Sequence, residues 1–154
     1  MPDVSTFLWF KEKAEEAVRF YVSLLPNSAI QNVNRLPGDL SAVCLIEFTL
    51  EGRPFIAMES AMGAEPFNNS VSIMVLCDSQ AEIDRLWAAL TNGGREIACG
   101  WLKDRYGMAW QITPRALIEM NKDKDRTKAT RALQAMNKMV KLDIAALESA
   151  FNGD

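Results

Sequence analysis

The stretch from Cys99 to Trp110, CGWLKDRYGMAW, contains a thiol, an ammonium group, a carboxylate and two indoles. These residue types could form a catalytic cluster, or they could alternate between the two faces of a β-hairpin. Residues 104–107, DRYG, have the composition of a tight turn, which favours the hairpin. Trp110 then belongs to a helix-covered core face, Lys103 points to solvent beside the turn, and Trp101 is either core or cavity wall.

The chain contains no histidine. This absence excludes Ser–His and Cys–His nucleophile pairs and histidine-based zinc or iron sites. Acid–base chemistry would depend on Asp, Glu, Lys, Tyr or Cys. The three cysteines show no Cys-x-x-Cys spacing, so we expect reduced structural thiols in a cytoplasmic protein, Cys99 included.

Composition narrows the class of protein further. A chain of 154 residues with 49% hydrophobic and 24% charged residues is typical of one soluble globular domain. A net charge of −3 gives no electrostatic basis for nucleic-acid binding. No apolar run is long enough to span a membrane and no signal peptide opens the chain, so we expect neither a membrane partner nor export.

Hydrophobic periodicity predicts the element order β-α-β-β-β, then β-α-β-β, then helices. Glu51-Gly52 between two strand patterns indicates a hairpin, and Ser79 is the predicted N-cap of the second helix. We expect a single α+β domain over residues 1–154, with a curved mixed sheet and helices on its outer face. Module one covers about 1–62, module two about 70–113, and a C-terminal helical extension about 114–154.

A shift of 66 positions aligns Thr6 with Ser72 and Tyr21 with Trp87, which indicates a repeat of pattern.

Strand alternation assigns side chains to two faces. One face, with Phe7, Trp9, Ile56, Met58 and Trp110, is uniformly apolar and is predicted to pack beneath the helices. The other mixes polar groups with apolar ones and could line a ligand cavity, or it could be a solvated or dimer-facing surface. This second face contains Thr6, Leu8, Phe10, Phe55, Glu59, Ser72, Met74 and Gln111.

Several segments carry a family likeness: FLWFKEKAEEAVRFYVSLLPNS, CDSQAEIDRLWAAL, CGWLKDRYGMAWQITP and KLDIAALESAF. Together they resemble the vicinal oxygen chelate superfamily of glyoxalases, bleomycin-resistance proteins and extradiol dioxygenases. The likeness is closer to the PhnB-like branch, often labelled 3-demethylubiquinone 3-methyltransferase. The resemblance implies paired β-α-β-β-β modules and, because superfamily members commonly pair, a homodimer.

Superfamily enzymes hold a divalent metal with four side chains. The resemblance places these positions at Thr6, Glu59, Ser72 and Gln111. Only Glu59 is a strong ligand, because hydroxyls and neutral amides bind Zn²⁺, Ni²⁺ or Fe²⁺ poorly. We therefore predict the superfamily fold without a metal or other cofactor.

Three functions stay open. The first is a metal-free protein that binds a small organic molecule, with Phe10, Phe55 and Trp101 as cavity walls. The second is an enzyme with Glu59 as general base and Glu47 as a possible second carboxylate. The third is a structural or interaction protein. Methyltransferase activity of the Rossmann type is disfavoured because no glycine-rich loop follows the first strand.

Overall fold

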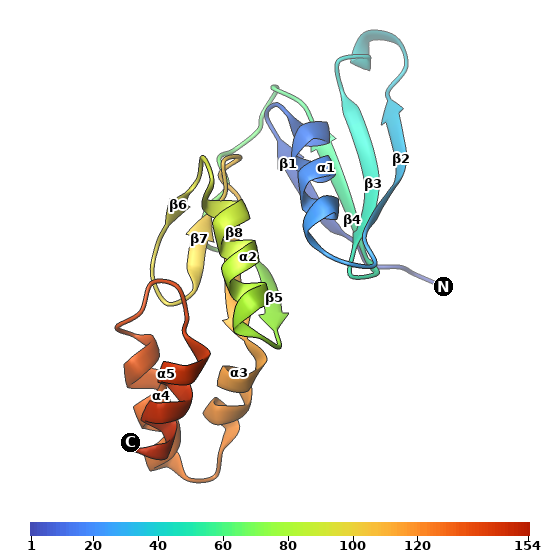
Figure 1. Ribbon diagram of the computed structural model, residues 1–154. Coiled ribbons are helices and arrows are strands. Elements are labelled where there is room, and N and C mark those ends of the chain that lie inside the picture. Colours follow the sequence, from blue (N-terminus) through green and yellow to red (C-terminus); the bar gives the residue numbers. More distant parts are fainter. The chain divides into compact units, whose positions relative to one another are not determined.

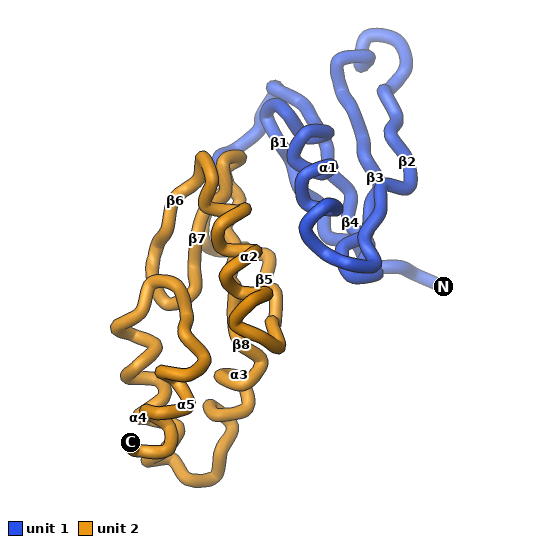
Figure 2. The backbone as a smooth tube through the Cα atoms, viewed as in Figure 1, with its two compact units in different colours: residues 1–66 blue, residues 67–154 orange.

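A computed structural model describes residues 1–154 and divides them into two compact units, residues 1–66 and 67–154 (Figures 1 and 2). Each unit contains one four-stranded sheet with parallel and antiparallel pairs. A helix covers one face of each sheet, and three further helices follow the second sheet. The predicted α+β class is confirmed.

Unit 1 comprises β1 (Thr6–Phe10), α1 (Ala14–Leu24), β2 (Ala29–Arg35), the 3-10 helix η1 (Gly38–Leu40), β3 (Cys44–Leu50) and β4 (Arg53–Glu59). Its strand order is β1-β4-β3-β2, with β1 parallel to β4 and the other pairs antiparallel. The predicted β3–β4 hairpin is confirmed. Glu51 and Gly52 connect its strands with φ values of 47° and 72°, the left-handed conformation that two-residue hairpin turns require.

The core of unit 1 lies between α1 and one face of the sheet. The amphipathic helix buries Ala17, Val18 and Tyr21 completely. The sheet contributes residues from β1, β3 and β4. The buried sheet residues are Leu8, Phe10, Cys44, Ile46, Phe48, Leu50 and Ala57.

Unit 2 comprises β5 (Ile73–Cys77), α2 (Gln80–Thr91), β6 (Arg95–Glu96), β7 (Trp101–Lys103), β8 (Ala109–Pro114), α3 (Arg115–Lys122), α4 (Arg126–Met136) and α5 (Ile144–Asn152). Its strand order is β5-β8-β7-β6, which matches unit 1 strand for strand. The sequence pattern predicted one strand where the structure has β6 and β7. Positive φ values at Cys99 (55°) and Gly100 (83°) break the extended backbone between them.

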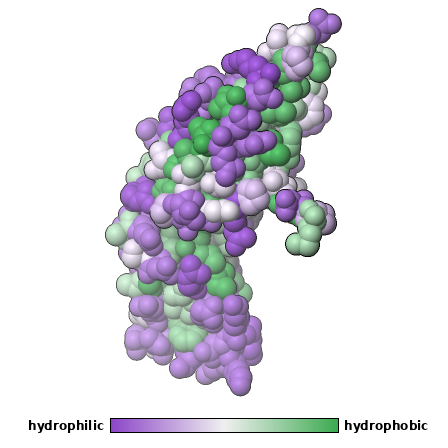
Figure 3. Space-filling view, turned by 90° about the vertical axis from the view of Figure 1, so that its right-hand side faces the viewer, coloured by the Kyte–Doolittle hydropathy of each residue, from purple (hydrophilic) through white to green (hydrophobic).

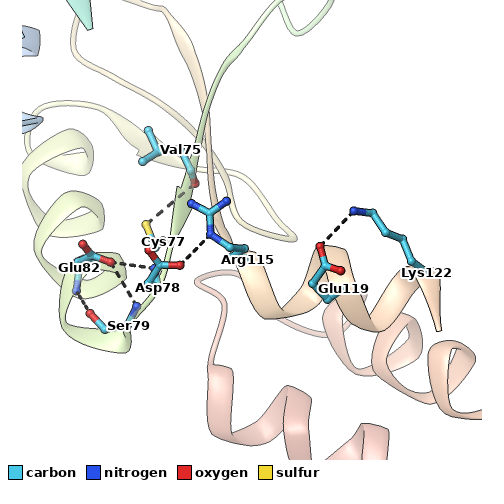
Figure 4. Close-up of polar contacts among 8 residues, drawn as sticks. All are labelled: Val75, Cys77, Asp78, Ser79, Glu82, Arg115, Glu119 and Lys122. Atoms are coloured by element: carbon cyan, nitrogen blue, oxygen red, sulfur yellow. Dashed lines mark hydrogen bonds and ion pairs between the residues drawn. The ribbon is translucent and has the colours of Figure 1, made fainter. Parts of the chain in front are cut away.

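A capping box starts α2, as the N-cap position of Ser79 predicted (Figure 4). The Glu82 carboxylate accepts hydrogen bonds from the backbone N–H groups of Asp78 (2.8 Å) and Ser79 (3.2 Å). The Glu82 backbone N–H donates to Ser79 Oγ at 3.3 Å. The side chain of Asp78 also pairs with Arg115 at the start of α3 (2.8 Å). These contacts fix a two-residue connection between β5 and α2.

The C-terminal helices of unit 2 form a hydrophobic cluster of their own. Its buried members are Leu117, Met120, Ala132, Leu142 and Leu147, with Met136 and Met139 packed against them. Backbone N–H groups of Cys99 and Gly100 donate to the carbonyls of Met139 and Val140, both at 2.8 Å. The three methionines of the extension thus belong to an internal core.

None of the helices is both long and apolar enough to cross a membrane. On the face drawn in Figure 3, hydrophilic residues are distributed along the length of the chain and interrupt the apolar areas. The larger exposed apolar side chains include Phe7, Val71 and Met74.

Candidate functional site

The two faces of the unit 1 sheet are reversed relative to the prediction. Leu8 and Phe10 are 3% and 2% exposed beneath α1, whereas Phe7 is 50% exposed. Ala57 and Glu59, the register partners of Leu8 and Phe10, lie on the same helix-covered face. The face of unit 1 that was predicted to line a cavity therefore lies on the side of α1. The opposite, open face carries Phe7, Trp9, Leu45, Glu47, Ile56 and Met58.

The reversal has a local cause. Three residues, 11–13, connect β1 to α1, whereas two residues, 78–79, connect β5 to α2. The 66-residue shift aligns the helices correctly, because Tyr21 and Trp87 are both buried against their sheets. Because of the extra residue, the shift that aligns the two helices places β1 one residue out of step with β5. A displacement of one residue moves every strand side chain to the opposite face of the sheet.

Glu59 caps a helix instead of facing open space. Its Oε2 accepts a 2.8 Å hydrogen bond from the backbone N–H of Ala14, the first residue of α1. The preceding residue, Lys13, has a left-handed φ of 61° and makes no side-chain cap. Glu59 thus supplies from β4 the anionic acceptor that the helix N-terminus favours.

The remaining predicted residues of unit 1 do not converge on a site. Thr6 is exposed at the start of β1. Phe55 stacks on Phe48, with ring centroids 5.2 Å apart, at the helix-covered face. Glu47 is exposed on the open face, and its carboxylate makes no hydrogen bond or ion pair.

In unit 2 the predicted residues do come together, on the face opposite α2. Gln111 Nε2 donates a 2.9 Å hydrogen bond to Ser72 Oγ. Met74 and Trp101 are the register partners of Gln111 on either side, so their side chains share its face. Met74 is 46% exposed and Trp101 is partly exposed. We call this the open face of unit 2.

The hairpin that carries Trp101 and Gln111 is organised by a buried carboxylate. Asp104, 3% exposed, accepts hydrogen bonds from the backbone N–H groups of Tyr106 (2.8 Å) and Met108 (3.1 Å). Its other oxygen accepts from Trp110 Nε1 at 2.9 Å. The prediction that Trp110 lies in the helix-covered core is confirmed, since the residue is fully buried.

Two cationic residues on the open face of unit 2 were not predicted. Lys103 and Arg95 are register partners across β7 and β6, on the same side of the sheet as Trp101. Counting two residues from Trp101 would have located Lys103, which was assigned to solvent beside the turn. Uninterrupted alternation through residues 95–103 would also have placed Arg95 on this face, because it lies an even number of residues from Trp101.

The side chains that could act as metal ligands in the two units do not fit a transition metal. Neither unit contains a cluster of three or more His, Cys, Asp or Glu residues. Ser72 and Gln111 offer a hydroxyl and a neutral amide, which already bond to each other. Glu59, the strong ligand of the expected set, is engaged by Ala14 at the helix-covered face.

The cysteine thiols are free. Burial raises the pKa of Cys77 from 9.0 to about 11, and it also raises the pKa of Cys44. Because the thiolate is the reactive form, these two cysteines are poor nucleophiles. Cys99 is partly buried, and its backbone N–H bonds to Met139.

Comparison with known proteins agrees with this architecture. Residues 2–113, more than half of the chain, match the family described as 3-demethylubiquinone-9 3-methyltransferase. A Bacillus cereus PhnB protein that carries this description is 34% identical, with a TM-score of 0.67. The match covers 73% of this chain and 99% of that protein. No curated protein matches the sequence.

Two more distant structures share the fold. Protein PA1353 from Pseudomonas aeruginosa is 22% identical with a TM-score of 0.63, over 74% of this chain and 98% of that protein. The fosfomycin resistance protein FosX from Mesorhizobium loti is 14% identical with a TM-score of 0.57, over 79% of this chain and 98% of that protein.

The family description names a methyltransferase, but the fold is not the one that common S-adenosylmethionine enzymes use. Those enzymes have a doubly wound parallel sheet with a glycine-rich turn after its first strand. Here each sheet is mixed, and Lys11, Glu12 and Lys13 connect β1 to α1. Strand order, repeated β-α-β-β-β modules and the matched relatives together identify the chain as a member of the PhnB-like family, within the vicinal oxygen chelate superfamily and its glyoxalase/bleomycin-resistance fold.

Proposed function

We propose that this protein binds a small organic molecule on the open face of unit 2 and does so without a metal. The observation that carries the proposal is the Gln111–Ser72 hydrogen bond. Gln111 lies between Met74, which is exposed, and Trp101, which is partly exposed. Small-molecule sites combine apolar and aromatic surface with a few placed polar groups, and this face offers both.

The polar pair is suited to orient a ligand. Gln111 uses one amide N–H for Ser72, which leaves its Oε1 and its second N–H available. The Ser72 hydroxyl accepts that bond and keeps its own proton to donate. The indole of Trp101 and the thioether of Met74 add polarizable contact area for a flat ligand.

Binding is proposed to be metal-free because the open face offers no strong ligand for a transition metal. The proposal predicts no stoichiometric transition metal in protein purified without chelator. A homodimer is also proposed, because pairing is common in the superfamily. Sedimentation equilibrium would test that part independently of ligand binding.

A thermal-shift screen against a panel of small metabolites and antibiotics tests the proposal. Compounds that raise the Tm of the wild type are expected to lose their effect on Gln111→Leu. Gln31→Leu is the matched control, because Gln31 is exposed on β2 of unit 1. The proposal fails if no compound stabilises the wild type, or if hits stabilise Gln111→Leu as strongly as Gln31→Leu.

A further inference from the structure

Two cations face each other across strands on the open face of unit 2. Arg95 on β6 is the register partner of Lys103 on β7, and Lys103 is the partner of Ala109 on β8. The next row of the same face holds Trp101, Gln111 and Met74. A row that carries positive charge therefore lies beside a row with aromatic and apolar surface.

Neither cation has an acidic partner. Ion pairs in the structure join Arg19 to Glu15, Arg115 to Asp78, Lys122 to Glu119 and Lys141 to Asp84, and none of these includes Arg95 or Lys103. Arg95 is exposed and Lys103 is partly buried, and the side chain of neither makes a hydrogen bond. This pair stands out in a protein whose net charge is −3.

The acidic side chains nearest along the sheet point away from the open face. Glu96, next to Arg95, accepts a 2.7 Å hydrogen bond from Trp87 Nε1 of α2. Asp104, next to Lys103, is buried and accepts from the indole of Trp110. The strand residues on the open face of unit 2 thus carry charge of one sign only.

Like charges directly opposite each other on neighbouring strands destabilise a sheet. A bound anion would remove that repulsion and gain charge-assisted hydrogen bonds from both side chains. Lys103 and Trp101 are two residues apart on one strand, so their side chains emerge about 7 Å apart. A ligand with an anionic group beside a flat ring matches this spacing.

We propose that the ligand class of this site is an aromatic carboxylate, with its charge on Arg95 and Lys103 and its ring against Trp101 and Met74. This inference rests on the proposed function, because it concerns the same face. The inference adds Arg95 and Lys103 to the site. These two residues favour an anionic ligand, whereas the uncharged Gln111–Ser72 pair does not.

Isothermal titration calorimetry with 2-naphthoate, 2-naphthamide and acetate provides the test. The wild type is expected to bind 2-naphthoate at least about tenfold more tightly than 2-naphthamide, which has the ring without the charge. Acetate, which has the charge without the ring, should bind more weakly than 2-naphthoate. Raising the salt concentration should weaken 2-naphthoate binding, because both cations are accessible to solvent.

The double variant Arg95→Gln/Lys103→Gln should lose at least about tenfold in affinity for 2-naphthoate and leave affinity for 2-naphthamide unchanged. Lys124→Gln/Lys138→Gln, which removes two exposed lysines of the C-terminal helical region, is the matched control and should bind as the wild type does. Equal affinity for the two naphthyl compounds, no affinity for 2-naphthoate, or an unaffected double variant would each overturn the inference.

These outcomes separate the inference from the proposed function. If the thermal-shift screen yields ligands that depend on Gln111 but are indifferent to Arg95 and Lys103, the face binds small molecules and the anionic class is wrong. If the screen yields no ligand at all, the proposed function and the inference about the ligand class both fail.

Discussion

The backbone N–H of Ala14 donates a 2.8 Å hydrogen bond to the carboxylate of Glu59, which links the end of β4 to the start of α1. Residues 45 positions apart in sequence thus complete one helix terminus. The carboxylate that the sequence marked as a candidate general base has an observed structural role. Its contact also explains why α1 begins without a side-chain cap of its own.

Replacing Glu59 by alanine should therefore lower the free energy of unfolding by about 1 kcal/mol, the usual cost of losing an N-cap acceptor. Glu59→Gln keeps an acceptor oxygen and should cost less. Urea denaturation of the variants measures both effects. Glu47→Ala, at an exposed position on β3, is the control and should change stability by no more than about 0.5 kcal/mol. Equal effects of Glu59→Ala and Glu47→Ala would contradict the capping role.

Much of the fold could be predicted because its signals are local. Helical spacing of apolar residues located α1 and α2, Glu51–Gly52 marked the β3–β4 hairpin, and Ser79 marked a helix start. Alternation also assigned the faces of unit 2 correctly, since Trp110 is buried while Met74 is exposed. Each of these features depends on residues within a few positions of one another.

The assignment of side chains to the two faces of the unit 1 sheet was wrong because it depends on the length of the connection between β1 and α1. Lys13 adopts a left-handed backbone conformation and adds one residue before α1, which no strand or helix pattern records. The break between β6 and β7 was missed for a different reason. It is held by hydrogen bonds from Cys99 and Gly100 to residues 139 and 140, distant in sequence.

The β7–β8 hairpin should depend strongly on Asp104. Asp104→Asn replaces one acceptor oxygen by an amino group, which cannot accept the hydrogen bonds that the carboxylate now receives. We expect a loss of about 2 kcal/mol or more in unfolding free energy, because a buried donor is left without a partner. Asp39→Asn, at an exposed position in η1, is the control. A loss at Asp104 no larger than at Asp39 would refute this account of the hairpin.

Stability should fall in alkali through Cys77. Burial raises the pKa of this thiol from 9.0 to about 11 in the folded protein. Between these values the unfolded chain loses the proton and the folded protein keeps it, so stability decreases as pH rises from about 9 to about 11. Denaturation curves at several pH values should show a steeper decline for the wild type than for Cys77→Ala. Parallel declines would mean that Cys77 contributes nothing to the alkaline loss.

The segment before α5 should be held by Gln80 at the start of α2. The Gln80 side chain donates to the carbonyl of Leu142 (3.1 Å) and accepts from the N–H of Ile144 (2.9 Å). In Gln80→Ala the amide of Ile144 should exchange with deuterium about fivefold faster or more, as expected for loss of a hydrogen bond worth about 1 kcal/mol. Gln134→Ala on the exposed side of α4 is the control. Unchanged exchange at Ile144 would argue against this attachment.

The most direct test of ligand binding on the open face of unit 2 is a two-dimensional NMR titration with 2-naphthoate, in protein shown to be free of transition metal. Binding on this face should shift mainly the resonances of the Trp101 indole N–H, the Gln111 side-chain amide and the β5 and β7 backbone around them. The same titration of Gln111→Leu should show much smaller shifts at Trp101. Shifts confined to unit 1 or to α4 and α5, or no shifts without added metal, would contradict it.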